Sequence, residues 1–164
     1  MGAAMLRRAL PWAILAACRS APADEARFAG VQDRGGVAMG VDQYTSSHVF
    51  EPLPDGGRIV LQRGSVDPAG TQVIREHMRR IAAAFAAGDF GLPGFVHAQK
   101  VPGTAIMAAR REAISYTADT LPRGGEVRIR TTDSAAVRAV HEFLAFQRSD
   151  HHAGAHLHSD TTAP

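Results

Sequence analysis

An internal repeat constrains the fold of this chain more than any other feature of its sequence. Residues 53–61 read LPDGGRIVL and residues 121–129 read LPRGGEVRI, a shift of 68 positions (121 − 53). In both copies the proline presets φ for a turn, and the paired glycines accept the positive φ that tight hairpin turns require. Each turn is followed by a predicted return strand, over residues 58–62 in the first copy and 126–131 in the second. Each copy therefore predicts a β-hairpin.

Each predicted hairpin is followed by a polar break and then by an amphipathic helical pattern. Thr71 is a candidate N-cap for the first helix, and Asp133 or Ser134 for the second. An alignment of the two helices at a shift of 64 positions (141 − 77) matches His77 with His141. The apolar stripes are Ile74, Met78, Ile81 and Phe85 in the first helix, and Val137, Val140, His141 and Leu144 in the second.

The repeat predicts an α+β fold with two layers. Two duplicated hairpin–helix units are expected to form one antiparallel four-stranded sheet with the helices on one face, because each hairpin has only one polar face. The ordered domain is expected over residues 39–150, with a brief helix over 104–111 in the Gly- and Pro-rich connection. Residues 18–38 are expected to be a flexible tether, because most of this stretch is small, charged and aperiodic.

Residues 1–17 have the pattern of a secretory signal, with two arginines before an apolar run at 9–17 that is too short to span a bilayer. The LAAC sequence that ends at Cys18 resembles the bacterial lipobox, in which the cysteine is lipidated and anchors the protein to the membrane. Arg19 after the cysteine resembles outer-membrane sorting signals. The alternative is ordinary cleavage after Ala23, which would release a soluble periplasmic protein. In both interpretations the chain is expected to be exported.

Composition excludes two classes of function. Without Arg7 and Arg8 of the leader, the chain has 16 basic and 16 acidic residues, so it lacks the positive charge of a nucleic-acid-binding protein. Cys18 is the only cysteine, which excludes an internal disulfide and a thiolate metal cluster.

Histidine and methionine are the ligands that remain for a soft or borderline metal. If the two units are related by a twofold axis, His77 and His141 face each other across the seam as core ligands, with His48 and His97 as auxiliaries. Met78 and Met107 are the thioether candidates. Copper is the first choice and zinc the second. The competing interpretation is that these histidines border the core and are each satisfied by one hydrogen bond.

Four further histidines follow the domain, in a polar segment over 151–164 that is expected to be disordered. Such a tail would chelate copper, nickel or zinc only weakly. The candidates are His151, His152, His156 and His158.

Catalysis is not expected, because the chain has no G-x-S-x-G, H-E-x-x-H or glycine-rich phosphate motif. Acid–base pairs remain as alternatives, either Asp42 with His48 or Glu142 with His141. The alternative to metal binding is a metal-free binding or scaffold module of the envelope. Its docking face would be lined by Arg58, Gln62, Arg128 and Arg130.

Three stretches resemble a group of uncharacterised exported bacterial proteins: MGVDQ at residues 39–43, HVF at 48–50 and VHEFLAFQ at 140–147. The resemblance spans about residues 39–152 and implies export without assigning an activity. Similar sequences sometimes carry an aspartate carbamoyltransferase label. This chain lacks that enzyme's Ser-x-Arg-Thr-Arg phosphate loop and its His-Pro-x-Gln segment, so the resemblance does not extend to that activity.

Overall fold

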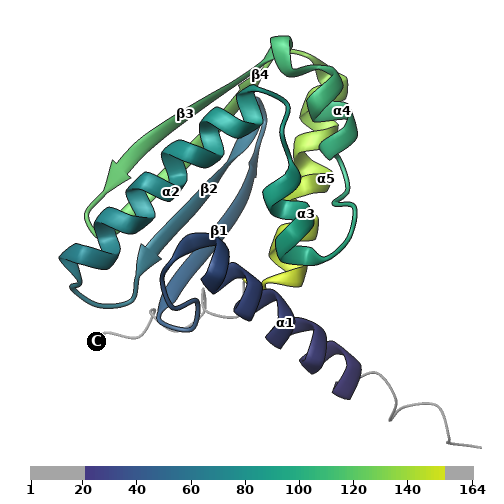
Figure 1. The fold of residues 1–164 in the computed structure, drawn as a ribbon. Helices are drawn as coiled ribbons and strands as arrows, with labels where there is room; N and C mark the ends of the chain where they lie inside the picture. Colours follow the sequence, from purple (N-terminus) through teal and green to yellow (C-terminus); the bar gives the residue numbers. More distant parts are fainter. Residues whose placement is uncertain (1–20, 154–164) are drawn as a thin grey trace, which may run out of the picture.

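The two predicted hairpins lie side by side in one antiparallel sheet, in the order β1-β2-β4-β3. A computed structural model describes residues 21–153 of the chain (Figure 1). The strands are β1 (Ser46–Leu53), β2 (Gly56–Arg63), β3 (Ile114–Leu121) and β4 (Gly124–Thr131). The helices are α1 (Ala21–Met39), α2 (Pro68–Ala86), α3 (Gly91–His97), α4 (Thr104–Ala109) and α5 (Ser134–Asp150), with a 3-10 turn at Arg111–Ala113.

The register at the centre of the sheet relates the two units by a local twofold axis. Every strand residue in the first hairpin corresponds to the residue 68 positions later in the second, since β1 and β3 begin at Ser46 and Ile114. Where β2 pairs with β4, Ile59 lies opposite Val127, which is its own equivalent. A pair of equivalent residues facing each other across antiparallel strands is the arrangement that a twofold axis requires.

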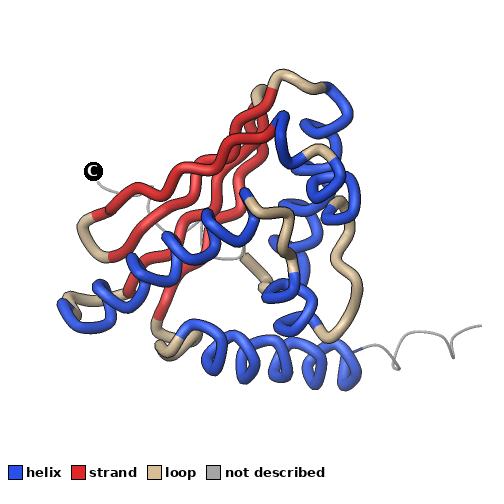
Figure 2. Tube along the Cα trace, turned by 45° about the horizontal axis from the view of Figure 1, so that its top comes forward, coloured by secondary structure: helices blue, strands red, loops and turns tan. Residues whose placement is uncertain are grey.

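The helices cover one face of this sheet, as Figures 1 and 2 show, and each long helix packs over the hairpin of the other unit. Helix α2 packs mainly on β3 and β4, whereas α5 packs mainly on β1 and β2. The apolar faces of the sheet and of both helices meet in one core, which includes Ile74, Val127 and Phe143. The predicted fold class, an α+β domain of two duplicated hairpin–helix units, is therefore confirmed.

The two long helices correspond at a shift of 66 positions, and the predicted shift of 64 is wrong. Asp67 caps α2 by accepting from the backbone N–H of Gly70, and Asp133 caps α5 by accepting from Ala135 and Ala136, so the caps are 66 positions apart (133 − 67). The link from hairpin to helix is two residues shorter in the second unit. An error of two residues turns a helix by about 200°, so it exchanges the buried and exposed faces.

Helix α1 occupies a stretch for which the sequence predicted a flexible tether. It packs against α3 and approaches α2, with the guanidinium of Arg34 donating to the carbonyl oxygen of Val96 at 2.7 Å. A weakly amphipathic helix of this kind is stabilised by tertiary contacts more than by its own sequence. No helix within the described residues is long and apolar enough to cross a membrane.

Candidate functional site

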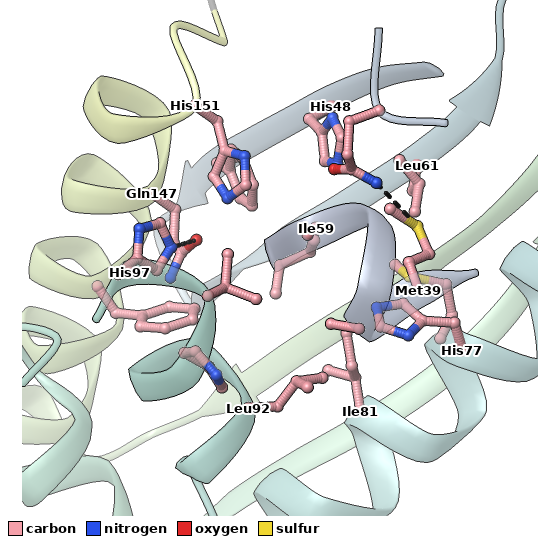
Figure 3. Close-up of a pocket in the computed structure, with 18 of the residues that line it drawn as sticks. Met39, His48, Ile59, Leu61, His77, Ile81, Leu92, His97, Gln147 and His151 are labelled. Carbon is pink, nitrogen blue, oxygen red and sulfur yellow. Dashed lines mark hydrogen bonds between the residues drawn. The ribbon is translucent and has the colours of Figure 1, made fainter. Parts of the chain in front are cut away.

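A cavity of about 80 Å³ lies where α2 and α5 diverge over β1 and β2, with α1 and α3 closing the space between them (Figure 3). Its walls are mostly apolar, from side chains such as Phe50, Leu61 and Ile81. Four histidines and two methionines also line it: His48, His77, His97, His151, Met39 and Met78. The cavity brings together side chains from six elements: α1, β1, β2, α2, α3 and α5.

Three of the cavity histidines are held neutral by burial. Burial lowers the pKa of His48 to about 4, helped by its neighbour His77. Burial lowers the pKa of His77 to about 4, with a smaller effect of Arg80. Burial lowers the pKa of His151 to about 2, and the imidazoles of His48 and His97 act in the same direction. All three imidazoles are therefore neutral at pH 7 and have a nitrogen lone pair for a ligand.

These three imidazoles also lack hydrogen-bond partners among the described residues. The side-chain hydrogen bonds of histidine in this part of the chain involve only His97 and His141. Nδ1 of His151 is buried and has no partner within the described residues. A buried polar atom without a partner costs free energy, so this nitrogen needs an explanation beyond packing.

The positions related to these three by the twofold axis show what packing alone requires. With strands compared at a shift of 68 and helices at 66, His48 corresponds to Tyr116, His77 to Phe143, and His151 to Phe85. The three aromatic equivalents form one cluster, in which Phe85 makes edge contacts with Tyr116 at 5.8 Å and with Phe143 at 5.7 Å. The fold thus accepts phenyl and phenol rings at all three positions. The imidazole nitrogens are not needed for packing.

His97 is held in a structural network. Its Nδ1 is hydrogen-bonded to the carboxylate of Asp150, and its Nε2 lies 2.8 Å from Oε1 of Gln147. Asp150 also forms an ion pair with Arg27, so the network connects α1, α3 and α5. Both ring nitrogens of His97 are engaged, which leaves no lone pair for a metal. The proposed role of His97 as an auxiliary ligand therefore has no geometric support.

His141 does not lie near His77. Its Nε2 donates to the carbonyl oxygen of Leu53 at 2.9 Å, in the turn of the first hairpin. The equivalent turn oxygen of the second hairpin, at Leu121, accepts from Arg75 of α2 at 2.7 Å, and Arg75 corresponds to His141 at the shift of 66. His141 is thus the equivalent of Arg75 and secures a turn. The predicted pair of facing histidines is wrong because it used the helix register of 64.

Two methionines line the cavity together with the imidazoles, and only one of them was predicted. Met39, at the end of α1, and Met78, on α2, both line the cavity and are almost fully buried. Figure 3 shows Met39 between His48 and His77, with its sulfur accepting a long hydrogen bond from Nε2 of Gln43 at 3.8 Å. Met107, the other predicted thioether, packs in the apolar core and does not line the cavity.

The arrangement limits which ions the cavity suits. Within residues 21–153, no three His, Cys, Asp or Glu side chains are placed to hold one ion. A site here would therefore combine two imidazoles with thioether sulfur. Such a set suits a soft ion of low coordination number, such as monovalent copper, better than zinc, which usually takes three or four nitrogen, sulfur or oxygen ligands from the protein.

The comparisons with known proteins add no family. No protein-family model, curated protein or solved structure matches this chain. The chemistry of the cavity is therefore inferred from the geometry of its own residues.

The other predicted sites lie elsewhere. Asp42 accepts from the backbone N–H of Tyr44 at 2.9 Å and makes no hydrogen bond with His48. His152 stacks on Phe28 outside the cavity, with ring centroids 4.2 Å apart, so neither it nor His151 belongs to a disordered tail. His156 and His158 lie outside the described residues, as do Cys18 and the leader.

The proposed docking face exists, but its charges are paired. Arg58, Gln62, Arg128 and Arg130 all lie on the side of the sheet away from the helices. Arg58 forms ion pairs with Glu51 and Glu126, and Asp55 pairs with Arg128 and lies 3.9 Å from Arg130. Such exposed, internally neutralised pairs are typical of a solvated surface.

Two cavity residues were missed by sequence reasoning as members of this site, Met39 and His151. Met39 was assigned to the start of the domain, and the helix that precedes it was not predicted. His151 was placed in the tail because it follows the last helix. The one available signal was the alignment at a shift of 66, which matches His151 with the stripe residue Phe85.

Proposed function

We propose that this domain binds monovalent copper in the cavity, with His48 and His77 as nitrogen ligands and Met39 and Met78 as thioether ligands. The observation that carries the proposal is that histidines occupy three positions whose equivalents, related by the twofold axis of the sheet and long helices, are occupied by an aromatic cluster. The imidazoles of His48 and His77 are neutral and without partners among the described residues, and they line the same cavity as two buried methionines.

Protons and metal ions compete for the nitrogen lone pairs of the two imidazoles. A metal ligand must be deprotonated, and the lowered pKa values of His48 and His77 remove the proton as a competitor at neutral pH. Neutral imidazole and thioether add no negative charge, so a monovalent ion in apolar surroundings costs less to bury than a divalent one. The role that follows is sequestration, because nothing in the cavity marks a group for catalysis.

The test is an anaerobic titration of the protein with monovalent copper against a chromophoric chelator. A background variant, Cys18→Ser with His156→Ala and His158→Ala, removes the competing ligands of the leader and tail. We expect one ion per chain, and X-ray absorption at the copper edge should show both nitrogen and sulfur neighbours. Protein purified without an affinity tag is required.

The deciding variants take the residue found in the other half of the fold. His48→Tyr and His77→Phe reproduce Tyr116 and Phe143, so each is expected to fold. Each should weaken copper binding by at least about a hundredfold, since losing even an outer hydrogen-bond partner of a metal ligand costs about 10–100-fold. His141→Gln is the matched control and should bind as the background does. A background that binds no copper, or binding that survives both variants, would refute the proposal and favour a metal-free envelope module.

We also propose that the chain is exported and anchored to the outer membrane through a lipid on Cys18. The support is the leader pattern and the lipobox-like LAAC sequence. Only Arg19 and Ser20 separate Cys18 from the first residue of α1, so the domain would lie close to the membrane surface. Labelled palmitate that enters the full chain but not a Cys18→Ala variant tests the anchor. Equal labelling of both would refute it.

A further inference from the structure

A wider groove of about 680 Å³ lies outside the cavity, between β1, the middle of α1 and the end of α5. Unlike the cavity it is partly polar, with Ser46, Ser47, Glu51 and Arg148 among its walls. It therefore offers a hydrated approach to the interior of the domain.

The groove and the cavity share one wall. Four residues line both spaces: Gln43, His48, Phe50 and His151. Three of them form a cluster of rings, in which His151 stacks on His48 with centroids 5.0 Å apart and lies 5.3 Å from Phe50. Whatever passes from the groove to the cavity at this wall must pass these rings.

His151 is held at this wall by the end of α5. Its backbone N–H donates to the carbonyl oxygen of Gln147 at 3.0 Å, which closes the last turn of the helix. The next residue, His152, has a φ of +51°, so the chain turns away at once, and the His152 ring stacks on Phe28 of α1. The His151 ring is thus fixed while its Nδ1 remains without a partner among the described residues.

We infer that His151 and His48 form a transfer site that receives a soft monovalent metal ion from the groove and passes it to the inner ligands. This inference rests on the proposed function. His48 faces both spaces and is shared by the two sites, whereas His151 belongs to the wall and His77 lies only in the cavity. Exchange of one imidazole for the next keeps the ion coordinated along the whole route.

The test measures the rates of copper capture and release separately from the copper affinity. Stopped-flow mixing measures how fast the background variant takes copper from a chromophoric chelate, and how fast an excess of a second chelator removes it. His151→Phe keeps a ring at the position that Phe85 occupies in the other half, but it removes the nitrogen. Since a transfer site changes the path and not the end states, we expect capture and release to slow together by at least about tenfold, with Kd within about threefold of the background.

His152→Phe is the matched control, because this neighbouring histidine lines the groove but not the cavity. Its rates should equal those of the background. His151→Asn is the second variant, since its amide can satisfy a hydrogen bond in place of Nδ1 but binds soft ions poorly. It should slow capture as His151→Phe does, which excludes a packing defect as the cause.

Each result for the two His151 variants either supports or overturns the transfer site. Faster release with a weaker Kd in both His151 variants would make His151 a ligand of the resting site and overturn its role in transfer. Unchanged rates in both variants would place the entrance elsewhere. A background variant that takes up no copper would instead refute the proposed function, which the titration detects before any rate is measured.

Discussion

At the scale of the residue, the informative comparison is between equivalent positions of one chain. Phe143 and His77 occupy the same place in their units, as do Tyr116 and His48. A phenyl ring buried in such a place gains the transfer free energy of its whole surface, whereas an imidazole without a partner loses part of it to desolvation of its nitrogens. The histidine cluster is therefore expected to stabilise the fold less than the aromatic cluster does, a cost that the proposed copper site would account for.

This cost is measurable. His77→Phe should raise the free energy of unfolding of the metal-free protein by about 1 kcal/mol at pH 7, because it replaces a buried imidazole by a fully apolar ring and fills part of the adjoining cavity. Urea denaturation measures the change. Phe143→His is the reciprocal control and should destabilise the protein. A loss of stability in His77→Phe would show instead that the imidazole makes a stabilising contact.

At the scale of the element, both long helices cross the sheet over a glycine. Gly57 of β2 lies beneath Leu144 of α5, and its equivalent Gly125 of β4 lies beneath Met78 of α2. The absence of a β-carbon lets each helix approach the strands closely. The second glycine of each repeated turn sequence thus serves helix packing as well as the hairpin.

A β-carbon would have less room at the crossing over Gly57 than at the crossing over Gly125. A β-carbon on Gly57 would collide with the Leu144 side chain and would lie 2.8 Å from the carbonyl oxygen of Glu51. On Gly125 it would lie 3.4 Å from Cγ of Met78 and 3.0 Å from the carbonyl oxygen of Asp119. Gly57→Ala should therefore destabilise by about 2–3 kcal/mol, and Gly125→Ala by about 1 kcal/mol or less, since overpacking costs about 1–3 kcal/mol. Thermal unfolding of the pair measures this, and an equal loss in both would contradict it.

At the scale of the whole molecule, the site exists because the symmetry is incomplete. The sheet and the two long helices obey a twofold axis, but α1 and the α3–α4 connection have no counterpart among residues 21–153. They cover one side of the seam only, where α1 supplies Met39 and α3 supplies Leu92 and Val96 to the cavity walls. Because α1 and α3 cover the sheet on this side only, they bury the histidine cluster and thereby lower its pKa values.

The stability of the whole domain should depend on pH for the same reason. His48 and His77 have pKa values of about 4 when folded, against 6.5 for an unperturbed histidine, so the unfolded chain binds more protons between these limits. Stability is therefore full above pH 6.5 and falls as the pH drops toward 4. The loss is at most about 3 kcal/mol per histidine, at about 1.36 kcal/mol per pKa unit.

Urea unfolding of the metal-free protein at pH 7 and at pH 4.5 checks this dependence. His77→Phe should reduce the loss between the two pH values, because the substituted position no longer titrates. His141→Gln should leave the loss almost unchanged. A pH profile that is the same in His77→Phe as in the background would contradict the burial of a neutral His77.

Much of the fold follows from the sequence because its determinants are local. The repeated proline–glycine turns predicted both hairpins, and the periodic apolar residues predicted α2 and α5. The shared polar and apolar faces then required one sheet covered on one side. The helix register was missed because it depends on the length of each hairpin-to-helix link, and this length differs by two residues between the units.

The sequence by itself determined the two hairpins, the two long helices, their duplication and the kinds of ligand atom available to a chain with one cysteine, whereas α1 and α3 were not predicted. Only the tertiary structure decided which histidines meet. Placing His48, His77 and His151 around one cavity requires that α5 cross onto the first hairpin and that α1 and α3 close over it. These contacts join residues about 30 to 100 positions apart, and local periodicity does not encode which distant faces come together.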